Sequence, residues 1–467
     1  MRAVDTSYRR LAAITVPVGL GQLSYTAMGI LDTIMVGRLG VTALAGVGLG
    51  NIVAWWVLSL FWGMLAGVNT LVAQAVGAGR PRAAGVALWQ GLHLGAVCAV
   101  AMLGLWPAAP WLFALTGVDR EVQEIAASYM RIRLLGGIGL TTLMVTDNFY
   151  RGVGRTEIPM WCGFLKLAIN CCGNYVFIFG AFGAPALGTD GAAVGTVTAN
   201  IAIGVLMLAL LLGRREFREP YALLSTRRLR AGPFRELLRV SLPIGVQTFM
   251  EMGGVSVFTA IVGRLGQAQL AATNAVIQAW SVAFMLGFSL SVGATTLVGQ
   301  CVGAGAPEQG RVVVSRVLRV GVVLNALLAV FYLALPEWLM GLFVEPSQAG
   351  AVLPFARPLF TIVVLCLGLD LAFMVHWGAL RGAGDTTFSM LVNIGSAWLL
   401  LVPGAYLAAP RFGVVGAWSL LIVHVGTMAA LTTWRFRGTA WQRGARIAGD
   451  EDGEGGGGGS ELALDVS

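Results

Sequence analysis

A series of twelve apolar stretches constrains this chain more than any other feature. A helix needs about 20 apolar residues to cross the hydrocarbon core of a bilayer. Only 12% of the 467 residues are charged, against roughly 25% in soluble domains. The pattern predicts an all-α, multi-pass membrane protein and excludes an ordinary cytosolic enzyme. The predicted spans lie near residues 11–36, 45–75, 86–112, 125–150, 159–182, 188–213, 240–262, 270–302, 312–335, 352–378, 387–409 and 413–435.

Arginine supplies 30 of the 31 basic residues and is unevenly divided between the segments that join these spans. If the N-terminus is cytoplasmic and the spans alternate, cytoplasmic segments hold 23 Arg and the opposite side holds 7. Cytoplasmic loops of membrane proteins are enriched in Lys and Arg. We therefore expect both termini inside, with the chain in the cytoplasmic (inner) membrane. The net charge of +8 then reflects topology, and no nucleic-acid partner is expected.

The chain contains two copies of one unit. TLVAQAVGAGRP at 70–81 recurs as TLVGQCVGAGAP at 296–307, with nine of twelve positions identical, and VGRLG at 36–40 recurs at 262–266. Both pairs have an offset of 226, and a weaker pair, RGxGxT at 151–156 and 381–386, has an offset of 230. Each copy holds six spans, an even number, so the sequence predicts a parallel repeat with its axis along the membrane normal.

This repeat divides the chain into four predicted parts. A bundle of six helices over 1–213 is joined by an Arg-rich cytoplasmic linker, 214–239, to a second six-helix bundle over 240–436. The remaining segment, 437–467, turns acidic and glycine-rich, a composition that cannot bury a core, and is predicted to be a disordered cytoplasmic tail. Two bundles facing each other leave a central cavity that suits alternating access.

Four acidic residues lie within apolar spans: Asp32, Asp147, Glu251 and Asp370. Burial of such a group costs at least ~2.5–3.5 kcal/mol, so it marks a functional site by default. Glu251 and Asp370 lie deep in their spans, and as a pair they are candidates to exchange a proton or hold Na⁺. Asp32, toward the outer end of its span, is either functional or an interfacial carboxylate. Asp147 precedes Arg151 by four residues, and an ion pair on one helix face explains it.

A few neutral or basic polar groups accompany these carboxylates. Asn170 and Asn174 lie four residues apart, hence on one helix face, and Thr196 begins the neighbouring span. They are either oxygen ligands for an ion or hydrogen-bonding partners between helices. Lys166, the only lysine, is expected to extend toward the interface, and His376 is either a partner of a carboxylate or interfacial. Since no catalytic constellation appears, we expect no enzyme activity and transport driven by an ion gradient.

The motifs resemble those of the multidrug and toxic compound extrusion (MATE) family. The resemblance covers about residues 10–436 and implies twelve helices in two V-shaped six-helix bundles. It further implies antiport of cationic, often aromatic organic compounds out of the cell against entering Na⁺ or H⁺, with no cofactor, by a monomer in the lipid bilayer. The motifs that carry it are PVGLGQLSYTAMGILDTIMVGRLG, VAQAVGAGRP, RGVGRTEIP, FGAPALGTDGAAVGT and the second-half copies PIGVQTFMEMGG, VGRLG and VGQCVGAGAP.

The resemblance also implies roles for residues of the first half. Asp32 falls on the first-helix Asp of the family's proton or cation site, and Asn170, Asn174 and Thr196 fall on its remaining polar positions. The family often has Asp where this chain has Asn174, so this chain carries one charge fewer there.

In the second half, Glu251 and Asp370 fall on the acidic pair typical of the NorM-like branch, where transient Na⁺ binding is implied. The tyrosine often found one turn before that Asp is Cys366 in this chain.

Two other functions are alternatives to antiport. A flippase for lipid-linked precursors, which shares a related two-lobed fold, would be expected to line its cavity with several Arg. An intramembrane enzyme would need a nucleophile and base, or a metal set, at one depth. The acidic character of the charges within the spans favours the antiporter.

Overall fold

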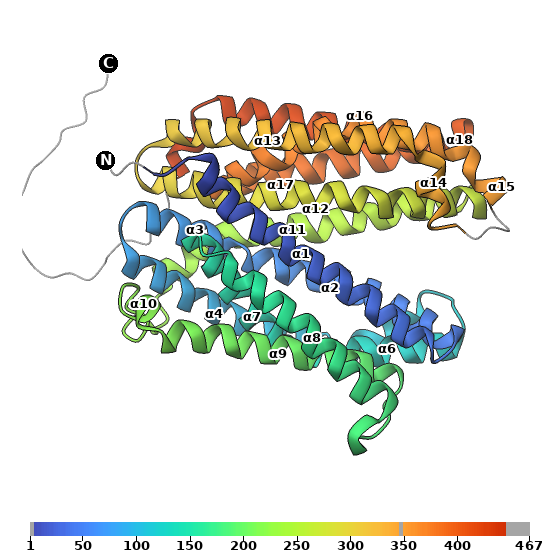
Figure 1. The fold of residues 1–467 in the computed structure, drawn as a ribbon, viewed down its shortest axis with the longest axis horizontal. Helices are drawn as coiled ribbons and strands as arrows, with labels where there is room; N and C mark the ends of the chain where they lie inside the picture. The colour runs from blue at the N-terminus through green and yellow to red at the C-terminus, as the bar shows by residue number, and fades with distance from the viewer. Residues whose placement is uncertain (1–3, 345–348, 445–467) are drawn as a thin grey trace, which may run out of the picture.

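The computed structural model of this protein describes residues 4–344 and 349–444. Within those residues the chain is helical, with turns and short connections and no strand. The helices form two lobes, α1–α9 and α11–α18, that lie side by side and diverge toward one end (Figure 1). The predicted all-α, two-lobed architecture is confirmed.

The N-terminal lobe consists of α1 to α9, and the short helix α10 (Arg215–Arg218) lies in the connection to the second lobe. The bounds are α1 Tyr8–Gly37, α2 Val41–Leu65, α3 Gly67–Gly77, α4 Pro81–Gly104, α5 Ala109–Ala114, α6 Arg120–Leu135, α7 Gly137–Val153, α8 Glu157–Phe179 and α9 Thr189–Gly213.

The C-terminal lobe repeats the plan with α11 to α18. Its bounds are α11 Ala231–Gly263, α12 Gln267–Gly303, α13 Pro307–Ala334, α14 Pro336–Gly341, α15 Ala349–Val352, α16 Ala356–Ala383, α17 Thr386–Gly395 and α18 Val402–Arg437, with one π-helical stretch, Ser396–Leu401, between the last two.

Twelve membrane spans emerge from these helices, as predicted. Ten helical segments of the described chain are long and apolar enough to cross a membrane. One of them, Thr386–Arg437, contains two spans, because its helix breaks at Gly413, where φ is 63°. The remaining span is formed by α6 and α7, which meet at Gly136. The span boundaries agree with the prediction to within several residues, but α11 begins at Ala231, well before the predicted residue 240.

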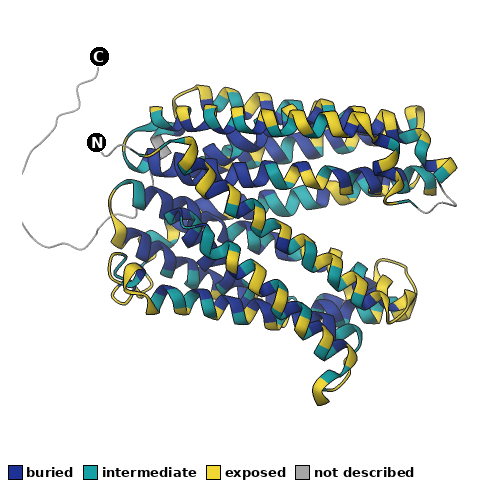
Figure 2. Cartoon of the chain, viewed as in Figure 1, coloured by how far each residue is buried: buried dark blue, intermediate teal, exposed yellow. Residues whose placement is uncertain are grey.

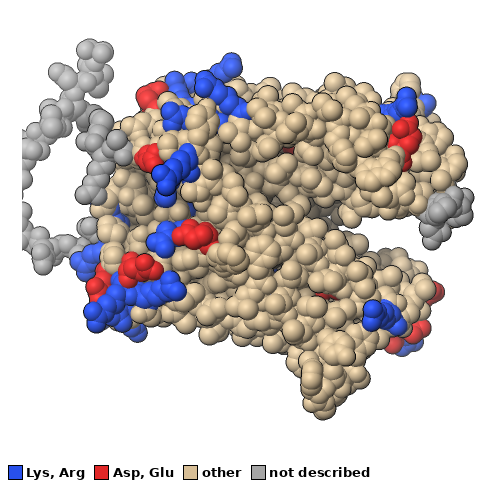
Figure 3. Space-filling model, viewed as in Figure 1, with Lys and Arg blue, Asp and Glu red and all other residues tan. Residues whose placement is uncertain are grey.

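The two lobes touch at the end of the molecule where α1 begins (Figure 1). Helix α1 packs on α8 in its own lobe and on α12 across the interface, while α11 packs on α17 and, across the interface, on α2. This exchange of contacts between first helices is what a duplicated unit produces when two copies face each other. Toward the other end the lobes separate, and a cleft opens between them (Figure 3).

Burial distinguishes central helices from peripheral ones (Figure 2). In α12, 78% of the most apolar stretch is buried, whereas the corresponding share in α13 is 17%. Helix α12 therefore lies at the junction of the lobes, and α13 presents an apolar outer surface. In a multi-pass membrane protein such a surface faces lipid.

Charged side chains gather at the closed end of the molecule (Figure 3). The connection between α9 and α11 contributes to this cluster and includes α10. Charge is sparse along the flanks of both lobes in this view, as expected for surfaces that contact hydrocarbon.

The predicted tail divides into two parts. Residues 445–467 lie outside the described residues. Closer to α18, however, Trp441 is fully buried, stacks on Phe436 with 4.5 Å between ring centroids, and donates its indole N–H to the Phe436 carbonyl oxygen at 2.7 Å. The prediction of disorder from residue 437 onward is therefore wrong for this first stretch, because one tryptophan anchors it to the C-terminal lobe.

Candidate ion and substrate sites

The polar residues predicted in the N-terminal lobe come together in one chain of hydrogen bonds across α1, α8 and α9. Asn174 donates its amide N–H to an Asp32 carboxylate oxygen at 2.5 Å and to Asn170 Oδ1 at 3.4 Å. Asn170 in turn donates to the Thr196 hydroxyl at 3.2 Å. Both asparagines are fully buried. The expectation that they share a helix face is confirmed.

This network leaves an oxygen available for a ligand. Asn174 Oδ1 is buried and has no hydrogen-bond partner among the described residues. Gly195 of α9 makes its position possible, because a Cβ there would collide with this oxygen. Buried amide oxygens are almost always paired. Asn174 Oδ1 is therefore an unpaired oxygen of the same amide group whose nitrogen contacts the Asp32 carboxylate.

Lys166 differs from its prediction. Its side chain is 5% exposed, and its ammonium group lies 4.4 Å from the centroid of the Tyr25 ring of α1. The expected extension toward the interface is wrong, because the aromatic face satisfies the cation inside the lobe. The N-terminal lobe thus holds a buried cation in addition to its carboxylate.

The C-terminal lobe holds a second acidic centre. Glu251 of α11 lies close enough to Asp370 of α16 for their charges to interact, and it lies beside Asn393 of α17. Asp370 faces the indole of Trp280 on α12. The two carboxylates lie in the same part of the lobe, with Asn393 and Trp280 as neighbours that the sequence did not reveal.

Of the four acidic residues within the spans, Asp147 forms an ion pair and the other three do not. In the part of the chain that the structure describes, Asp32, Glu251 and Asp370 have no Lys, Arg or His nitrogen within 4.0 Å. Asp147 instead contacts Arg151 at 2.7 Å, with both side chains almost buried. The predicted ion pair on α7 is confirmed. The other three acids are therefore available to bind a proton, a metal cation or a cationic compound.

A small enclosed cavity of about 20 Å³ lies between the lobes and is lined by Asp147, Arg151 and Arg381, together with Trp62, Asn69 and Trp377. Its volume admits about one water molecule. Arg381 is 7% exposed, its guanidinium lies 5.3 Å from the Trp377 ring centroid, and its Nε has no hydrogen-bond partner in the described chain. Two arginine side chains thus line the cavity. The charge of Arg151 is compensated by Asp147, and the charge of Arg381 has no carboxylate partner in the described chain.

The lobes are joined at the closed end by two matching pairs of hydrogen bonds. In one direction, Thr70 donates to the Arg381 carbonyl oxygen at 3.0 Å and Gln74 donates to the Gly382 carbonyl oxygen at 2.9 Å. In the other, Thr296 and Gln300 donate to the carbonyl oxygens of Arg151 and Gly152, both at 3.1 Å. The donors come from the TLVxQ repeat and the acceptors from the RGxG repeat. We call these four donors and their acceptors the latch.

Glycine makes the approach at the latch possible. A Cβ at Gly77 would collide with the Gln300 carbonyl oxygen, and a Cβ at Gly303 would collide with the Gln74 carbonyl oxygen. Small residues let helices in membranes approach closely. Gly77 and Gly303, which are equivalent in the two copies of the motif, thus allow the same close approach of the backbone from each lobe.

Sequence reasoning detected the repeated motifs but not their contact. One sequence feature did indicate the contact. Both copies of the motif carry a Thr and a Gln at equivalent positions in an apolar stretch, although a membrane span does not require polar residues there. His376, predicted as either a carboxylate partner or an interfacial group, contacts the Ala372 carbonyl oxygen at 2.7 Å and the Thr433 hydroxyl at 3.3 Å. It lines an outer groove of the lobe and does not contact Asp370.

The architecture is that of a membrane transporter: two repeated six-span lobes, a cleft open at one end, a hydrogen-bonded closure at the other and carboxylates without ion-pair partners inside the spans. Residues 17–176 and 243–407 match the MatE family. These residues make up more than half of the chain, and the chain belongs to this family.

Solved structures agree on the fold. A multidrug resistance MATE family transporter in an outward-facing conformation is 20% identical, with a TM-score of 0.83 over 92% of this chain and 94% of that one. The eukaryotic MATE transporter AtDTX14 is 20% identical, with a TM-score of 0.82 over 94% and 97%.

A transporter of the MOP superfamily from Pyrococcus furiosus is also 20% identical, with a TM-score of 0.83 over 93% of this chain and 96% of that one. Its binding pocket is described as reversed in polarity, suggesting a different function for that protein. At this identity the likeness concerns the fold. The ligand chemistry of each pocket depends on its own residues.

Proposed function

We propose that this membrane transporter is an antiporter that exports cationic, often aromatic organic compounds in exchange for Na⁺ or H⁺. The observation that carries the proposal is the set of three unpaired carboxylates within the spans, Asp32 in one lobe and Glu251 with Asp370 in the other. An acid without an ion-pair partner in a bilayer needs a proton, a metal ion or a cationic ligand to compensate its charge.

Competition at these carboxylates couples the two fluxes. An incoming proton or Na⁺ neutralises the acids and displaces the organic cation, while the ionised acids retain it. A ligand shifts a conformational equilibrium only by its differential affinity for the two states. The cleft opens at one end and the latch closes the other, so exchange of the ligands must accompany opening of the latch.

The proposed orientation places the latch and both termini on the cytoplasmic side, with the cleft facing outward in the cytoplasmic membrane. The cluster of charged residues at the closed end supports this orientation through the positive-inside rule (Figure 3). Two complete lobes in one chain support a working monomer.

The test is efflux of a fluorescent organic cation from efflux-deficient cells, driven separately by a Na⁺ pulse and by an acid pulse. Asp32→Asn and Glu251→Gln each remove one charge, and Glu124→Gln, which changes a side chain 68% exposed, is the matched control. We expect at least a tenfold loss in the variant whose carboxylate couples the driving ion and none in the control.

The pattern of loss identifies the lobe. Sodium-driven efflux lost in Glu251→Gln assigns coupling to the second lobe, whereas acid-driven efflux that survives it and fails in Asp32→Asn assigns coupling to the first. Correctly inserted protein without efflux under either gradient would overturn the proposal and favour the flippase.

A further inference from the structure

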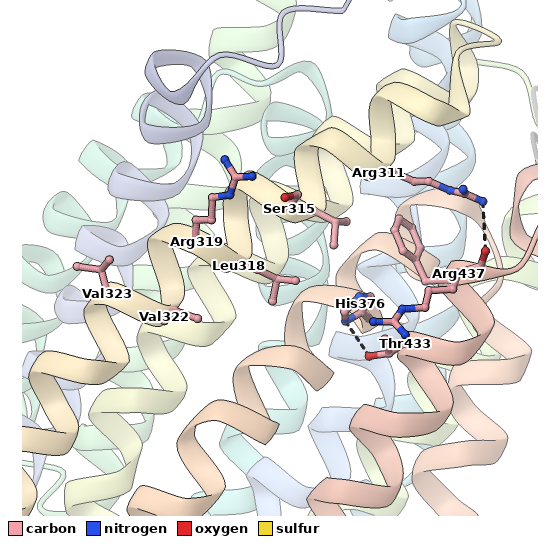
Figure 4. Close-up of a pocket in the computed structure, with 11 residues that line it drawn as sticks. Arg311, Ser315, Leu318, Arg319, Val322, Val323, His376, Thr433 and Arg437 are labelled. Atoms are coloured by element: carbon pink, nitrogen blue, oxygen red, sulfur yellow. Dashed lines mark hydrogen bonds between the residues drawn. The ribbon is translucent and has the colours of Figure 1, made fainter.

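A cavity lies away from the cleft, on the outer side of the C-terminal lobe. It has a volume of about 680 Å³ and lies between α13, α16 and α18 near the closed end (Figure 4). Ligand pockets typically measure ~300–1,000 Å³. None of the proposed coupling residues lines it, so it requires a separate explanation.

The polar part of this groove is strongly basic. Arg311 and Arg319 of α13 and Arg437 of α18 line it, together with the hydroxyls of Ser315 and Thr433. No carboxylate is among its lining residues. Arg437 extends across the groove toward His376 (Figure 4). Guanidinium groups and hydroxyls are the donors that proteins use for phosphate oxygens.

Two of the three arginines lack an acidic partner. Within residues 4–344 and 349–444, neither Arg319 nor Arg437 forms an ion pair. Arg311 is partly compensated: its Nε lies 3.6 Å from Glu308, and its terminal nitrogen donates to the carbonyl oxygens of Arg437 and Gly438, both at 3.2 Å. The groove therefore carries uncompensated positive charge.

The other part of the groove is apolar and continues onto the outer face of α13. Leu318, Val322 and Val323 line it, and the two valines are 58% and 61% exposed. Farther along the helix, away from the closed end, Leu327 and Val330 are 66% and 69% exposed. An amphiphile placed here would have its anionic end among the arginines and its hydrocarbon along these side chains.

We propose that this groove binds the phosphate group of an anionic phospholipid, whose acyl chains lie along α13. Basic pockets between membrane helices bind anionic head groups. The apolar continuation favours a lipid over a free phosphate, which would gain nothing from it. Because α16 carries both His376 of the groove and Asp370, the lipid would contact the helix of the second acidic centre. The proposal does not depend on the transported substrate.

The test compares lipid binding to the purified full chain by native mass spectrometry, with phosphatidylglycerol as the anionic probe and phosphatidylcholine as the zwitterionic one. Wild-type protein is expected to prefer the anionic lipid at least fivefold. Arg319→Gln combined with Arg437→Gln should abolish the preference, and Arg319→Lys with Arg437→Lys should retain part of it. Arg227→Gln with Arg228→Gln, the same charge change in the exposed connection, should leave it unchanged.

Two further measurements test the groove itself and distinguish a lipid from free phosphate. Ser315→Trp fills the groove without altering charge and should reduce anionic-lipid binding at least fivefold, and it serves alone if the double variant does not fold. Inorganic phosphate at millimolar concentration should not displace the lipid. Any of three results would overturn the proposal. These are an equal lipid preference in the two double glutamine variants, unchanged lipid binding in Ser315→Trp, and full displacement of the lipid by phosphate.

Discussion

The two lobes derive from one repeated unit, yet they place their charges at different positions. At the offset of 226, Asp32 of the first lobe corresponds to Phe258, and Glu251 of the second lobe corresponds to Tyr25. Neither carboxylate has an acidic counterpart. By contrast, the Thr and Gln donors of the latch are identical in both copies. Duplication has preserved the contact between the lobes, while the chemistry inside each lobe has diverged.

The arginines of the small cavity show the same divergence. Arg151 and Arg381 correspond at the offset of 230, and both supply a carbonyl oxygen to the latch. One turn earlier, however, the first lobe has Asp147 and the second has Trp377. One guanidinium is therefore held by a carboxylate and the other by an aromatic face. Equivalent mutations should therefore have equal effects at the latch, where both lobes make the same contacts, and unequal effects at the two arginine side chains.

The largest effect is expected at the glycines of the latch. Gly77→Ala and Gly303→Ala each place a Cβ against a backbone carbonyl oxygen of the opposite lobe, so each should prevent full closure and reduce efflux more than tenfold. The measurement is efflux together with the distance between spin labels on the two lobes at the closed end. Gly48→Ala, where a Cβ meets no atom within 4 Å, is the control. A strongly unequal effect of the two latch variants would contradict the symmetry of the closure.

Substitution of the two arginines should lower the stability of the protein to different extents. Arg151→Met leaves Asp147 buried without a partner, which typically costs roughly 3–5 kcal/mol. Arg381→Met removes a buried cation that has no carboxylate partner in the described chain, and it should change stability by about 1 kcal/mol or less. Thermal unfolding in detergent measures both.

A rescue variant controls this comparison. Asp147→Asn combined with Arg151→Met should recover most of the lost stability, because no charge is then left unpaired. Equal destabilisation by the two arginine variants would show that the ion pair is not what distinguishes the lobes.

A smaller effect is expected from giving the first lobe a second carboxylate. Asn174→Asp places a charged oxygen where an amide now contacts Asp32 at 2.5 Å. At ~4 Å from Na⁺ and an effective dielectric constant of ~20, such a charge contributes about 4 kcal/mol before its repulsion with Asp32 is subtracted. We expect the Na⁺ concentration for half-maximal efflux to fall about tenfold.

The matched control for that change is Asn200→Asp. Asn200 lies on α9, is 4% exposed and is not part of the Asp32 hydrogen-bond chain. An equal gain in Na⁺ response from both variants would contradict the assignment of the cation position to the Asp32 centre.

Sequence reasoning predicted the features that repeat or recur with helical spacing. The twelve spans, the duplication and the shared face of Asn170 and Asn174 all follow from period and composition. Contacts across the molecule were harder, because a Thr or Gln in an apolar stretch does not reveal whether its partner lies in its own lobe or the opposite one. The latch therefore required the structure.

Two single residues show the limits of composition. The segment around Trp441 reads as polar and glycine-rich, yet one aromatic ring buried against Phe436 is enough to hold it. Lys166 lies in the interior of α8, and the face of Tyr25 on α1, far away in the sequence, determines where its ammonium group lies. The decisive partner of Lys166 is thus remote in the sequence, whereas that of Trp441 lies only five residues away, near the end of α18.

The smallest effect concerns the ion pairs at the open end of each lobe. In the second lobe, the Arg357 guanidinium hydrogen-bonds Glu337 at 2.5 Å and lowers the pKa of that exposed carboxyl. Its stabilising effect is therefore present above the ordinary glutamate pKa and is lost as the pH falls through the lowered value. Glu337→Gln should slightly reduce the thermal midpoint at pH 7, with the difference from wild type vanishing in acid and shrinking at high salt.

Glu124→Gln in the first lobe breaks a more exposed pair, Arg120–Glu124, and should change the midpoint less, since exposed pairs contribute little. A difference for Glu337→Gln that grows as the pH is lowered would show that this ion pair does not stabilise the second lobe.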